Sequence, residues 1–439
     1  MNHMAQLRDS LADMPVESCD VLVIGGGPAG ATAAALLAER GRDVVMLEKD
    51  AHPRFHIGES LLPRNVPILE RLGVADAVHR VGVFKRGAEF VSDACGRTVA
   101  FPFALGLNKD YVHSYQVRRA DFDTILFRNA EQKGARAFEN TRVTDISFAE
   151  GGRGTRVTVQ GPDGETRVFA PRFVLDASGR DTFLANRFGA KESDKQNSTA
   201  AVFAHYRGAA FRTGDTEGYI TVHLVDDGWF WMIPLPDGIM SVGFVGNQSA
   251  FRNRVGSPQD LLMARIEASP SVSARMRNAE RVSEVSTTGN YSYRAGAAWG
   301  EGYVMIGDSF AFLDPVFSSG VLLAMTAAER GVDVAMAWLD DPKAGRLAAR
   351  RMERRTHREL NNIAWLIYRI NTPVMREMFM NPQNMFRMRD GLISILAGNL
   401  GGGIRARLPV FAFKTAFAAL SFKHRARARR DASVPVAAE

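Results

Sequence analysis

The first part of the chain shows a hydrophobic pattern that changes from strand to helix and back to strand. Residues 20–25 form a short apolar run with β-branched residues, which is typical of a buried parallel strand. Residues 28–40 are rich in alanine and leucine and predict a helix, which Gly41 ends. Residues 43–48 repeat the strand pattern. This order predicts a βαβ unit and therefore a parallel sheet with helices on its faces.

Later segments have a different pattern. Residues 199–245 alternate polar and apolar positions between glycine and aspartate turns, which predicts an antiparallel sheet and a second structural unit. Two further apolar runs, 172–176 and 302–307, end at glycines and predict buried strands. A clear helix is expected at 320–339, and the chain from 344 to about 422 is largely helical in pattern.

A glycine-rich turn, Gly25-x-Gly27-x-x-Gly30, joins the first strand to the first helix. The first glycine permits the tight turn, the second lets a pyrophosphate approach the backbone, and the third allows close packing of helix and strand. The helix N-terminus then offers unpaired N–H groups to the phosphates. Glu48 and Lys49 end the second strand, where a carboxylate would accept hydrogen bonds from ribose hydroxyls. This unit predicts a dinucleotide site but does not separate FAD from NAD.

Three further segments resemble elements of the FAD-containing hydroxylases and occur in the same order: 117–123, 174–179 and 303–308. By this resemblance Arg119 lies beside the flavin and Asp176 belongs to the middle motif of the cofactor site. Gly307 and Asp308 correspond to the element that holds the ribityl chain. The resemblance implies an α/β, glutathione-reductase-like FAD-binding fold, with an antiparallel-sheet substrate domain and a helical C-terminal segment.

Five more segments resemble the flavin-dependent halogenases, particularly those that act on phenols or on carrier-bound pyrroles and acyl groups: 55–63, 84–90, 228–234, 314–320 and 377–382. The resemblance covers residues from about 18 to 420. It implies an FADH2-dependent enzyme that oxidises chloride or bromide to hypohalous acid and halogenates an aromatic or pyrrole substrate, free or carrier-tethered. A separate flavin reductase would supply FADH2, because the sequence shows no second nucleotide-binding pattern.

The resemblance also assigns roles to three large side chains. Lys85 corresponds to the lysine that holds the hypohalous acid, a role that suits a compact ammonium donor whose pKa burial lowers. The alternative for Lys85 is an ordinary surface cation. Trp229 and Trp231 point to one face of a strand and would narrow the passage between flavin and substrate. Their alternative is packing in the core of the sheet.

A turn before the 320–339 helix carries the candidate halide site. After Pro315, the residues Ser318, Ser319 and Gly320 bring backbone N–H groups to a helix terminus, which binds anions for the same reason that it binds phosphate. Capping of the helix by a serine is compatible with this role. Tryptophan halogenases carry an acidic residue at the position of Phe317 and have long C-terminal insertions. Both features are missing here, so free tryptophan is not an expected substrate.

The charge of the chain is uneven. It has 55 Lys and Arg against 48 Asp and Glu, a net charge of +7. The basic residues of the C-terminal third fit an acidic acyl carrier protein, which opposite charges would steer toward them. The alternatives are binding to anionic lipid and a helix face that is merely solvated. Nucleic acid is not expected, because no binding motif accompanies the charge. The excess gathers in the C-terminal third at Arg350, Arg351, Arg354, Arg355, Arg358, Lys423, Arg425, Arg427, Arg429 and Arg430.

The cysteines, histidines and apolar windows exclude other classes. Two cysteines and nine scattered histidines have no metal-ligand spacing, so no metal is expected. No window offers about 18 uncharged apolar residues, so no membrane span is expected. The N-terminus lacks the basic start and apolar core of a signal peptide, and we expect a cytoplasmic protein.

We therefore expect four regions: a flexible tail at 1–18, an FAD-binding module at 19–343, a helical C-terminal segment at 344–422 and a basic flexible tail at 423–439. The module contains an inserted substrate-binding sheet from about 85–115 and 195–290. Two other functions stay open. One is a non-halogenating FAD-dependent monooxygenase, dehydrogenase, or isoprenoid or polyene reductase. The other is a flavin-binding structural or regulatory protein without turnover.

Overall fold

The computed structural model describes residues 15–110, 112–149, 154–194, 199–252, 256–289, 292–401 and 404–432. Its first sheet has the strand order β19-β20-β10-β1-β2-β7, and β9 and β8 extend it from β10. Strand β1 is parallel to both of its neighbours, β2 and β10. The strands are β1 (Val16–Ile24), β2 (Val44–Leu47), β7 (Arg136–Phe138), β8 (Arg142–Ser147), β9 (Arg156–Gln160), β10 (Thr166–Asp176), β19 (Trp299–Gly300) and β20 (Tyr303–Met305).

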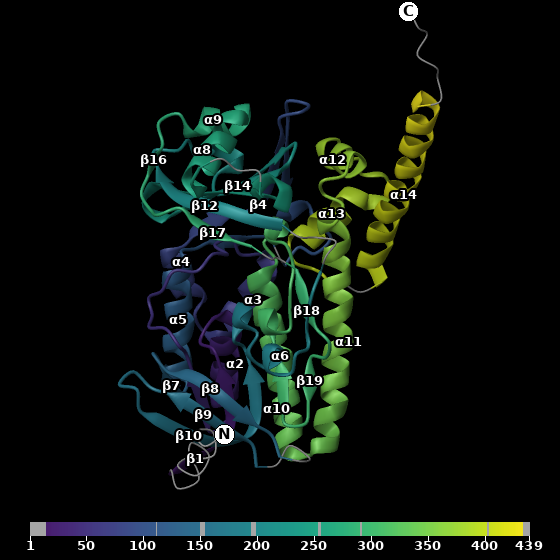
Figure 1. Cartoon of the computed structure of the whole chain (residues 1–439). Coiled ribbons are helices and arrows are strands. Elements are labelled where there is room, and N and C mark those ends of the chain that lie inside the picture. Colours follow the sequence, from purple (N-terminus) through teal and green to yellow (C-terminus); the bar gives the residue numbers. More distant parts are fainter. Residues whose placement is uncertain are drawn as a thin grey trace, which may run out of the picture.

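Helices and strands cover both faces of this sheet, which explains why its central strands are apolar throughout. Val21 and Val23 of β1 pack with three helices, and Leu22 and Ile24 pack on the opposite face with residues of β8 and β9. Figure 1 shows these helices rising beside the sheet in the lower half of the molecule. They are α2 (Pro28–Glu39), α5 (Arg119–Gln132) and α10 (Gly320–Asp340).

The second sheet is mainly antiparallel and has the order β16-β12-β15-β14-β13-β4-β5, with β17 beside β12. One of its faces contacts the C-terminal helices through Phe203 and Trp231. The other packs on α8 (Pro258–Ala268) and α9 (Pro270–Met276). The strands, which lie within the expected inserted stretches, are β4 (Gly87–Ser92), β5 (Arg97–Pro102), β12 (Thr199–Arg207), β13 (Ile220–Val225), β14 (Gly228–Leu235), β15 (Ile239–Asn247), β16 (Glu280–Arg281) and β17 (Ser286–Thr288).

Short elements connect the two sheets. Strand β3 (Val83–Lys85) pairs with β6 (Ser114–Gln116), and segment 59–61 lies along the other edge of β6. This pairing brings Lys85 and the segment around Ser60 together. The remaining short elements are α3 (Val66–Leu72), α4 (Ala75–Val81), α6 (Phe183–Arg187), α7 (Gln248–Arg252), β11 (Lys191–Ser193), β18 (Tyr293–Ala295) and β21 (Ala311–Phe312).

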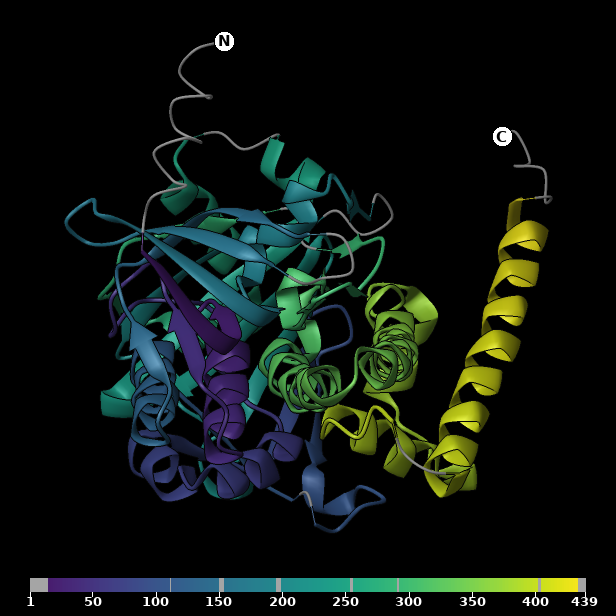
Figure 2. The ribbon, with the colours of Figure 1, turned by 90° about the horizontal axis from the view of Figure 1, so that it is seen from below.

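The C-terminal segment is helical: α11 (Pro342–Ile367), α12 (Pro373–Met380), α13 (Met388–Leu396) and α14 (Ile404–Ala432). Figures 1 and 2 show α14 standing at the edge of the molecule, with its C-terminal end directed away from the body. Because α14 continues to Ala432, residues 423–432 are helical where a flexible tail was expected. Strand β1 likewise begins at Val16, inside the expected N-terminal tail. Residues 1–14 and 433–439 lie outside the described residues. The predicted α/β class and helical C-terminal segment are confirmed.

Candidate functional site

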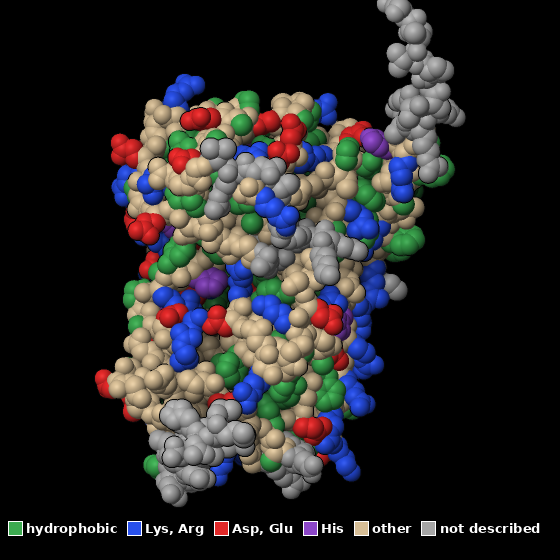
Figure 3. All heavy atoms as spheres, in the orientation of Figure 1, with side chains coloured by type: hydrophobic (Ala, Val, Ile, Leu, Met, Phe, Trp, Pro, Cys, Tyr) green, Lys and Arg blue, Asp and Glu red, His purple; other side chains and the backbone are tan. Residues whose placement is uncertain are grey.

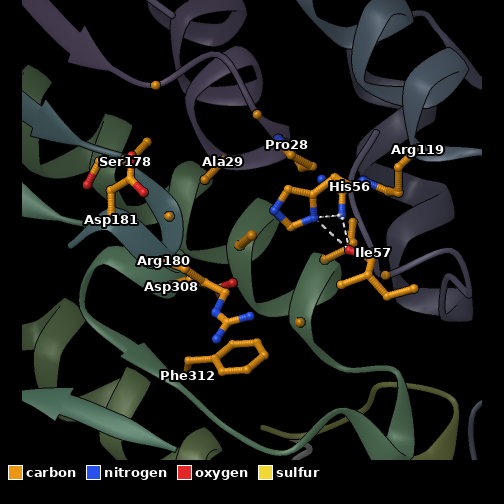
Figure 4. A pocket seen from close by; sticks show the side chains of 18 of the residues that line it. Pro28, Ala29, His56, Ile57, Arg119, Ser178, Arg180, Asp181, Asp308 and Phe312 are labelled. Atoms are coloured by element: carbon orange, nitrogen blue, oxygen red, sulfur yellow. Dashed lines mark hydrogen bonds between the residues drawn. The ribbon is translucent and has the colours of Figure 1, made fainter. Parts of the chain in front are cut away.

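One long cavity of about 330 Å³ passes from the end of β1 to β14. We call the part lined by Gly25, Gly27 and Glu48 the turn end. The part lined by Trp229, Trp231 and Gly320 is the tryptophan end. Figure 4 shows the region between them, with Pro28, His56 and Arg119 on one side and Arg180, Asp308 and Phe312 on the other.

The three glycines of the turn occupy their positions for different structural reasons. Gly25 has φ +101°, and a Cβ there would lie 2.5 Å from the carbonyl oxygen of Ala177. A Cβ on Gly30 would lie 1.8 Å from the carbonyl oxygen of Gly25. At Gly27 the nearest atom to a Cβ is the end of the Arg54 side chain at 3.5 Å. The fold thus requires Gly25 and Gly30, while Gly27 leaves the N-terminus of α2 open to the cavity, as a pyrophosphate needs.

Glu48 fixes the geometry of the turn end. One carboxylate oxygen accepts a hydrogen bond from the Gly26 N–H at 2.8 Å, and the other accepts one from the Asp50 N–H at 3.1 Å. Arg54 lies 3.4 Å from the same carboxylate. Lys49, the next residue, forms an ion pair with Asp181 and also lines the cavity. Both residues named from the sequence therefore border the cavity, and Glu48 is held rigidly in its wall.

Arg119 lies at the start of α5 and is almost fully buried. Its guanidinium donates two hydrogen bonds to Asp123, at 2.7 and 2.8 Å, and one to the Ile57 carbonyl at 2.9 Å. This cation lowers the pKa of the adjacent His56 to about 4, so the imidazole is neutral at pH 7. Arg54 adds a second cation, 3.3 Å from Asp123. The sequence indicated Arg119 but gave no reason to choose Arg54 or His56.

Asp308 follows strand β20 and lines the cavity opposite Arg119 (Figure 4). Burial raises the pKa of its carboxyl to about 7, and the nearby Arg180 and Arg119 oppose that rise. Gly307 has φ +64°, and its turn lies against α10 at Ala324. The sequence did not single out Arg180, although it directly follows the Ser178-Gly179 motif.

Asp176 does not line the cavity, although the resemblance places it among the cofactor residues. It is fully buried, and its two carboxylate oxygens accept hydrogen bonds from the backbone N–H groups of Ser178 and Leu184, both at 2.9 Å. The resemblance pointed to this motif but could not show which way the carboxylate points. Its position assigns it to holding the 177–184 turn, which itself borders the cavity.

Lys85 is 1% exposed, so the surface-cation alternative is wrong. Its Nζ donates to the Ser60 hydroxyl and to the Leu61 carbonyl, both at 2.8 Å, and lies 5.4 Å from the centre of the Phe103 ring. Burial lowers the pKa of this ammonium to about 7. Ser60 lines the cavity and Lys85 does not, so the ammonium lies one side chain behind the wall.

Trp229 and Trp231 both line the cavity from one face of β14, with ring centroids 5.9 Å apart. They also belong to the hydrophobic core beneath the C-terminal helices. The Trp231 indole donates to the Ser241 hydroxyl at 3.1 Å, which fixes the ring. The two tryptophans therefore both line the cavity and pack in the hydrophobic core of the sheet.

The turn before α10 leaves open space at the tryptophan end. Pro315, Ser318 and Gly320 line the cavity, whereas Ser319 is buried behind it. A Cβ on Gly320 would meet no atom within 4 Å. No side chain caps the helix at Ser319, and its first turn carries no acidic residue, so its N–H groups keep their positive end free for an anion. Phe317 points instead into the core.

The described residues contain no group of three or more His, Cys, Asp or Glu side chains arranged for a metal ion. Among the helices of the same residues, none combines the length and apolar character that crossing a bilayer requires.

Comparisons with known proteins agree with this fold and with FAD as its cofactor. Residues 18–326 match the family model of the FAD binding domain. The chain is 37% identical to a tryptophan 2-halogenase of Chondromyces crocatus, in an alignment covering 71% of this chain and 60% of that protein. It is 32% identical to the pyrrole-2-carbonyl carrier-protein brominase of Pseudoalteromonas luteoviolacea, covering 72% of this chain and 77% of the relative.

Two solved structures share the fold over nearly the whole chain. A flavoprotein/dehydrogenase from Cytophaga hutchinsonii has a TM-score of 0.84 and 28% identity, covering 93% of this chain and 100% of that one. A flavin-dependent brominase has a TM-score of 0.81 and 26% identity, covering 92% and 100%. The fold and site thus define an FAD-binding flavoprotein, as predicted. The chain belongs to the flavin-dependent halogenase family.

Proposed function

We propose that this protein is an FADH2-dependent halogenase that oxidises chloride or bromide to hypohalous acid and halogenates an aromatic or pyrrole substrate. The observation that carries the proposal is Lys85. Its ammonium is buried without a carboxylate partner among the described residues and contacts only Ser60, Leu61 and a phenyl ring. A fold does not gain stability from such a cation, because burial of an unpaired charge is costly. The position of this ammonium therefore favours a chemical role.

The turn end fits FAD. Gly27 and the N-terminus of α2 would receive the pyrophosphate, and Glu48 the ribose, with Lys49 beside it. Arg119 and Asp308, with Gly307 shaping the turn, would border the flavin side of the cofactor. When bound, FADH2 supplies electrons for the reaction of oxygen with halide. The chain's own residues orient this cofactor and keep its reactive part inside a cavity.

At the tryptophan end we propose that the α10 turn binds the halide and that the two tryptophans separate it from bulk solvent. Gly320 leaves room for an anion beside the free N–H groups. Hypohalous acid would then be held by Lys85 through the Ser60 hydroxyl, which lies between the ammonium and the cavity. The second sheet and the C-terminal helices would form the substrate side of the site.

Turnover with FAD, a flavin reductase, oxygen, and chloride or bromide tests this proposal. Substrates should include phenols, carrier-bound pyrroles and acyl groups, and free tryptophan, since one relative is named for tryptophan. Mass spectrometry should find a halogenated product with the wild-type chain and none with Lys85→Ala. The surface variant Lys133→Ala, which removes an ion pair with Glu39, is the matched control and should keep activity. Products that are oxidised but never halogenated would contradict the proposal.

A second candidate function is that of a non-halogenating FAD-dependent oxidoreductase. Two observations favour it: Lys85 does not itself line the cavity, and a flavoprotein/dehydrogenase is a close structural match. In this case Lys85→Ala should leave electron transfer between flavin and substrate unchanged in an anaerobic stopped-flow measurement without halide: reduction of FAD by the substrate of a dehydrogenase, or oxidation of FADH2 by the substrate of a reductase. Loss of halogenation together with unchanged flavin binding would instead support the first function.

We also propose an acidic acyl carrier protein as partner, docking on α11. Figure 3 shows Lys and Arg side chains along the edge that α11 forms, and five of its arginines are exposed. Opposite charges would accelerate association and make it sensitive to salt. The double variant Arg351→Glu/Arg354→Glu should lower kcat/KM for a carrier-loaded substrate and leave a free substrate unaffected. Arg156→Glu on β9 is the control. If kcat/KM for the carrier-loaded substrate changes neither with salt nor in the double variant, the proposal of this partner is wrong.

The separate flavin reductase is proposed because FADH2 must be supplied from outside. Halogenation driven by chemically reduced FAD alone, without a reductase, would support that separation.

The two free cysteines, Cys19 and Cys95, are consistent with the reducing cytoplasm that we propose as the compartment of this protein.

A further inference from the structure

A buried carboxylate that the proposed function leaves unused lies beside Ser60. Glu59 is 1% exposed and lines the cavity. Its backbone is fixed by a hydrogen bond from the Val117 N–H to the Glu59 carbonyl at 2.8 Å. Its Oε2 has no hydrogen-bond partner among the described residues. A carboxylate oxygen that is buried and unpartnered costs free energy, so its presence at a cavity requires an explanation.

The other oxygen of Glu59 leads away from the cavity. It lies 2.7 Å from Nε2 of His205, a residue of β12. His205 shares a strand face with Phe203, which contacts the Trp231 ring. The imidazole side chain is 18% exposed, and the exposed ring of Phe55 lies across it at 5.8 Å between centroids. Glu59 and His205 thus form a two-residue connection from the cavity to a partly solvated position.

We infer that Glu59 accepts the proton that the substrate ring loses on halogenation, and that His205 passes it to solvent. The inference rests on the proposed function. In that reaction the ring carbon bonds to the halogen, and the oxygen–halogen bond of hypohalous acid breaks. The hydroxide released takes a proton from Lys85 through Ser60 and becomes water, and the ring carbon gives its proton to Glu59. One proton leaves through His205 and one returns to Lys85 from solvent, so the net products are halogenated ring and water.

The positions of neighbouring residues separate the two proton tasks. Ser60 accepts a hydrogen bond from Lys85, which can donate a proton. Glu59 is hydrogen-bonded to His205, which can accept a proton from it. The two consecutive side chains therefore serve opposite proton transfers on one substrate, an arrangement typical of acid–base sites. A purely structural ion pair would not need a carboxylate oxygen left free at a cavity wall.

Ring-deuterated substrate provides the test. In the wild-type chain, transfer of the ring proton is assisted and the deuterium isotope effect on kcat should be near one. In Glu59→Gln, kcat should fall about 100-fold, and a normal primary isotope effect should appear, because unassisted loss of the proton becomes rate-limiting. His205→Gln should show a smaller loss of kcat, and Glu59→Asp should restore part of the activity. Flavin binding and halide oxidation should stay unchanged in all of them.

Glu89→Gln is the matched control, because Glu89 is equally buried and pairs with Arg212 away from the cavity. If Glu59→Gln halogenates at the wild-type rate, or slows without an isotope effect, the inference is wrong. If the wild-type chain itself gives no halogenated product, the proposed function fails, and the inference fails with it. The wild-type reaction therefore distinguishes the two failures.

Discussion

The two ends of the cavity are built differently, although a glycine turn and a helix N-terminus open each of them. At the turn end Glu48 accepts two backbone N–H groups, and in the adjoining middle of the cavity Arg119 is held by Asp123. Lys85, behind the cavity wall at Ser60, has no carboxylate partner among the described residues, and at the tryptophan end open space surrounds Gly320. The charged groups of the first region are held by protein partners, whereas we propose that the Lys85 ammonium and the open space at Gly320 serve the reacting groups.

The difference also separates two uses of glycine. The turn end cannot take a side chain at Gly30 because its own backbone occupies the space. At Gly320 the protein leaves the space empty. A glycine that the fold requires and a glycine that a ligand requires look identical in the sequence, and only the surrounding atoms tell them apart.

The largest effect is expected from Gly30→Ala at the turn end. Its Cβ would lie 1.8 Å from a carbonyl oxygen of the same turn, so helix α2 and strand β1 must move apart. Overpacking of this kind destabilises a fold by about 1–3 kcal/mol or more. We expect a lower Tm and loss of bound flavin in the absorbance spectrum. Gly41→Ala, at a position of φ +75° with open space around it, separates backbone strain from crowding and should keep the flavin. Normal flavin content in Gly30→Ala would contradict the packing we describe.

The sequence predicted the βαβ unit of the turn end, because its glycines, Glu48 and the two strands lie within one short segment, and Gly25, Gly27 and Glu48 line the cavity. Other features of the site depend on contacts that the sequence does not contain. The carboxylate of Asp176 lies within its motif, but local spacing could not tell that backbone N–H groups occupy it. Glu59 and His205 are 146 positions apart in the sequence, and they meet where β12 lies beside segment 59–61. Contacts of this kind depend on the assembly of distant segments, which no local pattern contains.

An effect of opposite sign on stability, without loss of the fold or the flavin, is expected from Lys85→Met behind the cavity wall. The folded-state pKa of Lys85 is about 7, below its ordinary value of 10.5, so between these pH values the unfolded chain binds more protons. Wild-type stability should therefore rise with pH through this window relative to the variant. Below pH 7 the full cost of the buried charge is present in the wild-type chain. There the free energy of unfolding of Lys85→Met should exceed that of the wild type by a few kcal/mol. The two hydrogen bonds that the variant loses make this gain smaller.

Denaturant unfolding of both chains at pH 6.5 and pH 9.5 measures this difference. The change in the gap between the two chains is the decisive quantity, because other titrating groups cancel in it. An equal gap at both pH values would mean that Lys85 is not desolvated in the way its contacts indicate. Lys133→Met, on the surface, should show no such change.

The smallest structural effect and the most specific functional one are expected from Gly320→Ala. A methyl group there meets no protein atom within 4 Å, so the free energy of unfolding should change by less than about 1 kcal/mol. The same methyl group would occupy space beside the free N–H groups of α10, where we propose the halide binds. The KM for halide should rise several-fold, more for bromide than for chloride because bromide is larger, while flavin binding stays normal. An unchanged halide KM would show that the anion binds elsewhere, and the open space at Gly320 would then belong to the cofactor or the substrate.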